Sequence, residues 1–382
     1  MDEARLRLTA DVTDTDSEAA MRTPSLLLLA VCVTAACDAP DRTIAPNGPD
    51  APNATSGRDL VVGPGQPPVL NVYSLVDISG GLPGRATDVN DSGWVVGTHT
   101  VSGGDHGFVR HADGTIEDLP PLSGDVSNVA TGINNAYQIV GTSTASNGTT
   151  HAWRRLPGHA LERLGDADCA GAAHANAIDD VGEIVGGCDF TPAEWHADSS
   201  THWRDKWNAG DLFDAAAHVV VGLVSGPGTD FDNVLWDYAE PLSLPMPHGT
   251  VHSRVNGVND SHEMVGEYEV GHESPSGGST ITSSGGFFFT HTVTHPIPHA
   301  AYGVSTKSRI VGWYVSIPAV AYTIAPNGIS PLGIATETAL PPSGVNRVAV
   351  RVNACGTIVG HYFPSGLSGG ARAAMWRKPV CD

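Results

Sequence analysis

The sequence is poor in positive charge. It holds 20 lysine and arginine residues against 41 aspartate and glutamate residues, and its formal net charge at pH 7 is −21. Contact with nucleic-acid phosphates needs lysine and arginine, so this balance excludes nucleic acid as a partner. The same acidity disfavours adsorption to anionic lipid headgroups. We interpret the negative charge as a means of keeping the protein soluble.

Motifs of several common catalytic centres are also missing. The chain has no His-Glu-x-x-His zinc motif, no phosphate-binding loop and no Ser-x-Asp-x-Gly-x-Thr-Trp box. A catalytic pair assembled from distant segments would escape such a search. The sequence therefore predicts no catalytic residue, no cofactor and no metal site. Enzyme activity stays uncertain from the sequence, and a protein without catalytic activity is the favoured interpretation.

Long apolar runs are scarce, and the most pronounced one stands near the start. Met21 and Arg22 precede a short apolar stretch at 25–33, which is followed by small residues at 34–36. A positive start, a short apolar core and small residues before a cut predict a secretory signal peptide over 21–36. The stretch is too short for a permanent membrane helix. Because residues 1–20 are acidic, we interpret them as an extension ahead of the true start.

The end of this signal, Thr34-Ala35-Ala36-Cys37, resembles the bacterial lipobox. The resemblance implies that Cys37 receives a diacylglyceryl group and becomes the mature N-terminus of a lipoprotein. Thr34 stands where that motif most often has leucine, and ordinary cleavage with a free Cys37 is the alternative. Residues 37–70 are rich in proline, glycine and aspartate and predict a disordered tether. We expect a membrane-anchored protein in the periplasm or on the cell surface.

One pattern returns seven times in the rest of the chain. Its clearest copies read Ala-Thr-Asp-Val-Asn-Asp-Ser-Gly-Trp-Val-Val-Gly at 86–97 and Ala-Thr-Gly-Ile-Asn-Asn-Ala-Tyr-Gln-Ile-Val-Gly at 130–141. Repetition at such a period predicts an array of similar supersecondary units. Each copy ends on a glycine, at intervals of 36 to 48 residues: Gly97, Gly141, Gly186, Gly222, Gly266, Gly312 and Gly360.

Each unit contains segments typical of four short strands, A to D. Strand A reads Ala-x-x-Val/Ile, and a turn of Asn, Asp and Gly leads to strand B, which ends on the glycine. Strand C carries an aromatic residue, as at 106–109, and strand D resembles Ile-Glu-Asp-Leu at 116–119 or Ile-Ser-Pro-Leu at 329–332. Four strands in about 45 residues match a propeller blade. We predict an all-β propeller over 71–382 with seven four-stranded blades.

The two ends of the repeat region complement each other. The last unit has a strand C at 374–376, and the sequence ends too soon after it for a full strand D. The first unit is preceded by a strand-like segment at 72–78 that belongs to no copy. We expect residues 72–78 to complete the last blade and to close the ring, because closure removes the exposed sheet edges.

The repeat core followed by a His-Ala-Phe-like strand resembles the bacterial extracellular HAF repeat. His151-Ala152-Trp153 is the nearest copy, and His106-Gly107-Phe108 differs by one residue. The resemblance covers roughly 71–376. It implies a location outside the cytoplasm and implies no reaction. We interpret His106 and His151 as packing or hydrogen-bonding residues of the repeat.

The cysteines support an exported protein. Six are present, of which Cys32 falls in the predicted signal and Cys37 at the anchor. The remaining even number suits an oxidising compartment, where disulfides form. Free buried thiols are the alternative. We expect two disulfides, each within one repeat: Cys169–Cys188 and Cys355–Cys381.

A few positions are candidates for binding. In propellers the B–C and D–A loops emerge on one face, and the B–C loop at 267–286 is long and rich in glycine and serine. The irregular fourth repeat gathers aromatic and histidine residues that form either a surface for sugar rings or peptide, or compensating core: Trp195, His202, Trp203 and Trp207. Two further patterns are weaker metal candidates, the Asn/Asp turns and the histidines at 291, 295 and 299.

We therefore expect a binding or assembly module, tethered to a membrane by its lipid, that recognises a glycan or protein through the B–C/D–A loop face. The alternatives are an envelope polysaccharide hydrolase or lyase with its site in the central channel, and a purely structural envelope protein. Carboxylates that converge on the channel would favour the enzyme. An aromatic rim would favour the binding module, and a smooth polar face the structural role.

Overall fold

The computed structural model describes most of the chain from residue 73 onward. The described residues are 73–165, 172–196, 201–203, 209–226, 229–237, 240–273, 279–290, 293–316, 319–329, 335–343, 345–364, 370–378 and 381. They belong to one compact unit, Pro68–Asp382. The predicted signal peptide, Cys37 and the predicted tether lie outside the described residues.

The strands of the described residues form seven antiparallel sheets of four strands each. Sheet 1 contains β2 (Gly84–Val89), β3 (Val95–Val101), β4 (Gly104–Arg110) and β5 (Ile116–Leu119). Sheet 2 contains β6 (Asp125–Ile133), β7 (Ile139–Ala145), β8 (Thr150–Arg155) and β9 (Glu162–Arg163). Sheet 3 contains β10 (Ala173–Ile178), β11 (Ile184–Cys188), β12 (Thr191–Trp195) and β13 (Thr201–Trp203).

The remaining sheets follow in chain order. Sheet 4 contains β14 (Ala209–Ala216), β15 (Val219–Gly226), β16 (Thr229–Asp237) and β17 (Glu240–Ser243). Sheet 5 contains β18 (Thr250–Val258), β19 (Met264–Glu273), β20 (Ser279–Thr290) and β21 (Val293–Ile297). Sheet 6 contains β22 (Ala301–Val304), β23 (Ile310–Tyr314), β24 (Val320–Ile329) and β25 (Ala335–Ala339). Sheet 7 contains β26 (Arg347–Val352), β27 (Ile358–Tyr362), β29 (Arg372–Arg377) and β1 (Ser74–Asp77).

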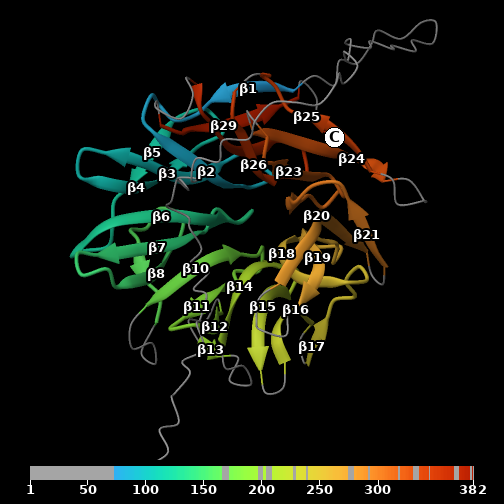
Figure 1. The fold of residues 1–382 in the computed structure, drawn as a ribbon. Coiled ribbons are helices and arrows are strands. Elements are labelled where there is room, and N and C mark those ends of the chain that lie inside the picture. Colours follow the sequence, from blue (N-terminus) through green and yellow to red (C-terminus); the bar gives the residue numbers. More distant parts are fainter. Residues whose placement is uncertain are drawn as a thin grey trace, which may run out of the picture. The chain divides into compact units, whose positions relative to one another are not determined.

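The sheets follow one another around a common centre, from blue to red in Figure 1, and the predicted β-propeller class is confirmed. Apolar side chains fill the space between neighbouring sheets. Between sheets 1 and 2, for example, Val96, Val109 and Leu119 pack against Ile139 and Trp153, and none of the five is more than 1% exposed. None of the described segments is a helix with the length and apolar character that a membrane crossing requires.

A glycine ends the core of each strand B because no side chain fits at that position. A Cβ on Gly97 would overlap the carbonyl oxygen of Arg85 and would lie 2.8 Å from the ring of Phe108. On Gly141 it would lie 2.5 Å from the ring of Trp153. In sheets 1, 2, 5 and 6 an aromatic side chain of strand C thus lies over the glycine of strand B, which explains why the two features recur together there.

The N-terminal strand completes the last sheet, as the sequence predicted. β1 pairs with β29 in antiparallel register, from Ser74 opposite Arg377 to Asp77 opposite Ala374. The indole of Trp376 on β29 is fully buried and donates a hydrogen bond to the carbonyl of Pro341, 2.6 Å away. The segment that opens the repeat region and the segment that ends it therefore belong to one sheet.

Two sequence predictions need correction. The fourth strand of sheet 6 is β25, whereas the sequence predicted it to begin at Ile329, which is the last residue of β24. β24 runs on to Ile329 after its pairing with β23 ends at Ile324, and residues 330–332 of the predicted strand lie outside the described residues. The predicted B–C loop at 267–286 is largely strand, since β19 and β20 stay paired out to Glu273 and Ser279. This hairpin extension, residues 267–273 and 279–285, is called the sheet 5 arm below.

Candidate functional site

A bulge at one fixed position of every strand A shapes the central channel. The pairing of strands A and B shifts there in all seven described sheets, as between Ala86 and Asp88. The residue after the bulge is small in four sheets, and it is charged in three, where it is Asp88, Asp214 or Arg351. These three side chains line a cavity of about 140 Å³ together with Thr131 and Asn176.

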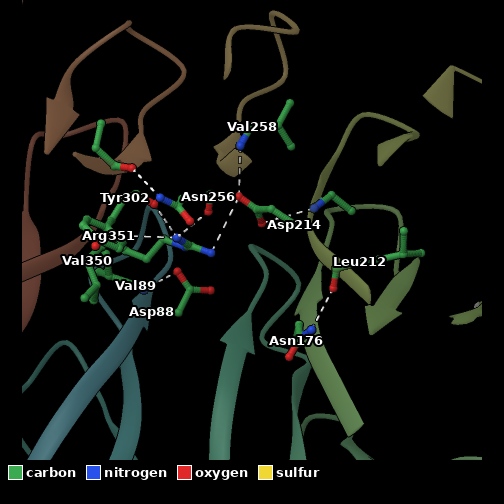
Figure 2. A network of polar contacts seen from close by, with 12 residues as sticks. Asp88, Val89, Asn176, Leu212, Asp214, Asn256, Val258, Tyr302, Val350 and Arg351 are labelled. Atoms are coloured by element: carbon green, nitrogen blue, oxygen red, sulfur yellow. Dashed lines mark hydrogen bonds and ion pairs between the residues drawn. The ribbon is translucent and has the colours of Figure 1, made fainter. Parts of the chain in front are cut away.

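Arg351 reaches across the channel to strands of other sheets. Its Nη1 donates hydrogen bonds to the carbonyl oxygens of Tyr302 at 2.6 Å and Asn256 at 3.3 Å (Figure 2). Its Nη2 lies 3.7 Å from Oδ2 of Asp214. Arg351 therefore connects its own sheet 7 with sheets 4, 5 and 6, and a guanidinium is suited to this because its five N–H groups point in several directions.

The two channel carboxylates are held by main-chain amides. Asp88 accepts hydrogen bonds from the N–H of Val89 at 2.8 Å and of Ile133, in the next sheet, at 2.9 Å. Asp214 does the same with its neighbour Ala215 at 3.1 Å and with Val258 of the next sheet at 3.0 Å. Each carboxylate thus fastens its own sheet to the following one.

Burial dominates the ionisation of both carboxyl groups. It raises the pKa of Asp88 to about 6, although Arg351 and the two amides oppose the change. Burial also raises the pKa of Asp214, again against Arg351 and the amides. Acidic side chains therefore do converge on the channel. Their carboxylate oxygens, however, accept hydrogen bonds that join neighbouring sheets. The volume of the cavity, about 140 Å³, is also smaller than the roughly 300–1,000 Å³ typical of small-molecule sites.

One mouth of the channel is lined by the A–B turns. In several of them an asparagine at the turn start, buried in each case, donates a hydrogen bond from its side-chain amide to a main-chain carbonyl of the next sheet. The acceptors are the corresponding turn residues: Asn90 to Asn134, Asn134 to Asp179, Asn259 to Ser305, and Asn353 to Asn90. We call these bonds the asparagine ladder.

The next position of the turns collects carboxylates at the same mouth. Asp91 and Asp180 each accept bonds from Asn135, and Asp91 also accepts one from the N–H of Ala354. Burial, with Asp180 and Asp91 nearby, raises the pKa of Asp260. The weak calcium-loop reading of these turns finds no support in their geometry, because the asparagine oxygens cap the hairpins themselves: Asn259 Oδ1 accepts from the N–H of Glu263.

The aromatic surface predicted around the fourth repeat does not include Trp195. For the other three residues it stays a prediction. Trp195 is only 1% exposed, and its indole donates a hydrogen bond to the carbonyl of Gly165, so it belongs to the core between sheets 2 and 3. His202 and Trp203 lie on β13, whose side chains are not among the described ones. Trp207 lies outside the described residues.

The cysteine prediction is confirmed for one pair. Cys355 and Cys381 form a disulfide that joins the A–B turn of sheet 7 to the C-terminal segment. Cys188 is buried and also disulfide-bonded. Its expected partner, Cys169, lies outside the described residues, so that pairing stays a prediction.

The histidines behave as the repeat suggested. His151 Nδ1 lies 2.9 Å from a buried carboxylate oxygen of Asp125, and His106 Nδ1 lies 2.9 Å from Asp118. The interpretation of both as hydrogen-bonding residues is confirmed. Of the weaker candidate trio, His299 stacks on Tyr314 and His295 approaches Phe288. Residue 291 lies outside the described ranges, so this metal candidate stays untested.

A serine motif in the chain stands in the wrong context for catalysis. Residues 366–370 read Gly-Leu-Ser-Gly-Gly, which fits the Gly-x-Ser-x-Gly spacing of a nucleophile turn. That turn works between a strand and a helix. Here the stretch connects β27 and β29, two antiparallel strands of one sheet, and most of it lies outside the described residues.

Comparison with solved structures supports the fold. The β-propeller domain of the Trilobed protease from Pyrococcus furiosus is similar, with a TM-score of 0.50, 8% sequence identity, and coverage of 77% of this chain and 93% of that one. Weaker likenesses include virginiamycin B lyase from Staphylococcus aureus, at 11% identity, a TM-score of 0.44 and coverage of 79% and 98%. No family profile and no curated protein matches the sequence. At such identities the likeness concerns the fold alone.

Sequence reasoning missed the charged channel residues. Asp88, Asp214 and Arg351 hold the position at which the other sheets have Gly132, Ala177, Gly257 and Gly303. An alignment of the repeats with one another would have shown three charges where small residues are the rule. It could not have shown that the three meet, because that depends on closure of the ring.

Proposed function

We propose that this protein is a lipid-anchored propeller outside the cytoplasm, a closed ring of seven blades, that recognises a glycan of the cell envelope through its B–C/D–A loop face. The proposal rests most directly on the sheet 5 arm. The anchor and the location rest on the resemblance of residues 34–37 to the lipobox and of the repeat to the HAF repeat.

The arm breaks the regularity of the loop face. β19 continues seven residues past Gly266, whereas β3 continues four residues past Gly97 and β11 two past Gly186. β18 accompanies it, since Thr250 pairs with Val270. A rigid scaffold that extends one variable element beyond its neighbours is the usual arrangement of a binding surface.

The chemistry of the arm suits hydroxyl-rich ligands. Residues 280–284 on β20 are exposed in an unbroken run and offer the hydroxyls of Thr280, Thr282, Ser283 and Ser284. A hydroxyl can both donate and accept hydrogen bonds. The Thr282 hydroxyl donates to the main-chain carbonyl of Val270, so it meets a ligand as an acceptor. Ile281, 41% exposed, adds an apolar contact within the run. Such a mixture of hydroxyls and a single aliphatic side chain matches the polar edges and C–H faces of sugar rings.

The channel supports an enzyme less well. A hydrolase or lyase needs a carboxylate free to move a proton at the substrate. The carboxylates of Asp88 and Asp214 each accept hydrogen bonds from two main-chain N–H groups. The guanidinium of Arg351 also forms an ion pair with Asp214. In this arrangement the channel charges hold sheets together, and recognition falls to the loop face.

A glycan and peptidoglycan-fragment array with the full-length protein tests the proposal. We expect saturable binding that drops at least about tenfold when Thr280, Thr282, Ser283 and Ser284 are all replaced by alanine, because hydrogen bonds to the ligand are lost. Ser261→Ala, in the exposed A–B turn at the opposite end of sheet 5, is the control and should bind as the parent does. A folded parent that binds no glycan, or a quadruple variant that binds equally well, would overturn the proposal in favour of a protein partner or a structural role.

A further inference from the structure

Five side chains with metal-binding chemistry meet where sheets 3 and 4 adjoin. Asp179 and Glu183 flank the A–B turn of sheet 3, Glu194 and His196 lie at the end of β12, and His218 lies in the A–B turn of sheet 4. Their donor atoms form two groups of three, and within each group they lie within 4.8 Å of one another. The groups share Glu183: Asp179, Glu183 and His218; and Glu183, Glu194 and His196.

The repeat shows that this turn departs from its counterparts. Asn90, Asn134, Asn259 and Asn353 extend the asparagine ladder to the following sheet. Asp179 holds the equivalent position, and its carboxylate has no N–H to donate. Instead, its Oδ2 accepts a bond from the main-chain N–H of His218 at 3.4 Å.

The residue four places further on departs in the same way. Asn134 Nδ2 donates to Gln138 Oε1, and Asn259 Nδ2 donates to Glu263 Oε2, both at 2.7 Å. Glu183 is the counterpart of Gln138 and Glu263, and it faces an aspartate that has no proton to offer. Two carboxylates thus stand where other sheets pair an amide with an acceptor.

The cluster concentrates negative charge in a largely buried place. Glu194 is 2% exposed and Asp179 is 4% exposed. The Glu183 side chain is 12% exposed and lies between them and the two histidines. Buried carboxylates at this density are stable when a cation is shared among them.

The spacing of the donors matches that of ligands around one ion. Nδ1 of His196 lies 3.6 Å from Oε1 of Glu183, and Nδ1 of His218 lies 3.6 Å from Oε2 of the same residue. These separations exceed hydrogen-bond length. Two ligands about 2.1 Å from a tetrahedral metal lie roughly 3.4 Å apart.

We propose that this cluster binds a divalent transition-metal ion of the zinc class, with Glu183 as the central ligand between the Asp179/His218 and Glu194/His196 sides. Imidazole together with carboxylate favours such an ion over calcium or magnesium, which prefer oxygen alone. The ion can enter from solvent, because the His196 and His218 side chains are 30% and 41% exposed. The bound metal would join sheets 3 and 4 where the asparagine ladder is interrupted.

The turn that carries His218 is a two-residue hairpin between β14 and β15, since Ala216 pairs with Val219. Ala217 and His218 have φ values of 46° and 68°, as both central residues of such a turn require. The short turn holds the His218 backbone in one conformation beside the A–B turn of sheet 3, where its N–H reaches Asp179.

A zinc titration of the untagged full-length protein, after treatment with a chelator and dialysis, tests the proposal by calorimetry. We expect saturable binding of one or two ions per chain and a rise in Tm with zinc. Glu183→Gln should lower the affinity at least about tenfold, as loss of a central ligand requires. Glu263→Gln, the same substitution at the same repeat position in sheet 5, is the matched control and should bind as the parent does. No saturable binding, or equal affinity in Glu183→Gln, would overturn the proposal.

A second variant separates a metal ligand from a purely structural carboxylate. Asp179→Asn restores the residue found at this position in sheets 1, 2, 5 and 7. We expect it to weaken zinc binding and, because it removes a buried charge, to raise the Tm of the metal-free protein. Unchanged zinc affinity together with a lowered metal-free Tm would show that Asp179 is a turn residue only and would contradict its role as ligand.

Discussion

The side-chain amide of Asn353 donates a hydrogen bond, 2.8 Å long, to the main-chain carbonyl of Asn90, 263 residues earlier in the chain. The bond joins the A–B turn of sheet 7 to that of sheet 1. It repeats, across the closure of the ring, the contact that Asn90 makes with Asn134. Ring closure therefore uses the same interaction as the contact between successive sheets.

Removal of this amide should weaken the ring. Asn353→Ala deletes the bond to Asn90 and the acceptor for the N–H of Thr357, and it leaves buried main-chain groups unsatisfied. We expect a loss of about 1–3 kcal/mol in the free energy of unfolding, measured by chemical denaturation. Asn147→Ala, in an exposed turn, should cost less. Equal losses in the two variants would show that the asparagine ladder contributes no more to stability than a hydrogen bond in an exposed turn.

Arg351→Met should be more damaging, because it leaves Asp88 and Asp214 buried without their counter-charge. Loss of one partner of a buried ionic group costs about 3–5 kcal/mol. The loss should be smaller at pH 5 than at pH 7.5, since protonation then removes the uncompensated charge. Arg377→Met, at an exposed position, is the control. A loss in Arg351→Met that does not change with pH would contradict the channel network.

The raised pKa of Asp88 sets the sign of a pH effect on stability. A folded pKa of about 6 lies above the ordinary value of 3.8, so the fold binds the proton more tightly than the unfolded chain does. The stabilisation is present below about pH 4 and is lost as pH rises through 6. Asp88→Asn should therefore gain stability relative to the parent between pH 4 and pH 7, by no more than about 3 kcal/mol.

An exposed aspartate provides the control for that experiment. The main-chain and side-chain hydrogen bonds from Thr115 lower the pKa of Asp113, so its contribution to stability has the opposite sign. Asp113→Asn should not gain on the parent as pH rises from 4 to 7. If Asp88→Asn and Asp113→Asn followed the same pH profile in thermal unfolding, the burial of Asp88 would not be the cause.

The disulfide between Cys355 and Cys381 should stabilise the last sheet. It closes a segment with a sequence separation of 26, for which the loss of chain entropy in the unfolded state predicts about 3–4 kcal/mol. Cys355→Ser with Cys381→Ser should lower the Tm under non-reducing conditions. An unchanged Tm would show that β1 and Trp376 hold this segment without the covalent link.

The sequence was informative where the structure repeats itself. The glycines that end strand B and the aromatic residues of strand C are fixed by local packing, so they predicted the sheets, and the unmatched segment before Ala86 predicted the pairing of β1 with β29. Local signals failed where an element departs from the repeat. Pro331 and Leu332 looked like the end of a fourth strand, yet that strand is Ala335–Ala339.

The candidate sites were harder to predict, because their members come from different sheets. Trp195 was grouped with Trp203 by nearness in sequence, but its ring packs toward sheet 2. Arg351 meets Asp214 only through closure of the ring, and His218 meets Glu183 only across a sheet boundary. Spacing along the chain carries no information about such contacts. The departures from the repeat at Asp179, Asp88 and Arg351 were the available signals.

Hydrogen–deuterium exchange of the full-length protein, with and without a saturating peptidoglycan fragment, tests recognition by the sheet 5 arm most directly. We expect slower exchange in residues 267–273 and 279–285 when the fragment is present, and unchanged exchange in the A–B turns around Asn90 and Asn134. Protection at those turns, with none in the arm, would contradict this expectation and would place recognition at the mouth of the channel.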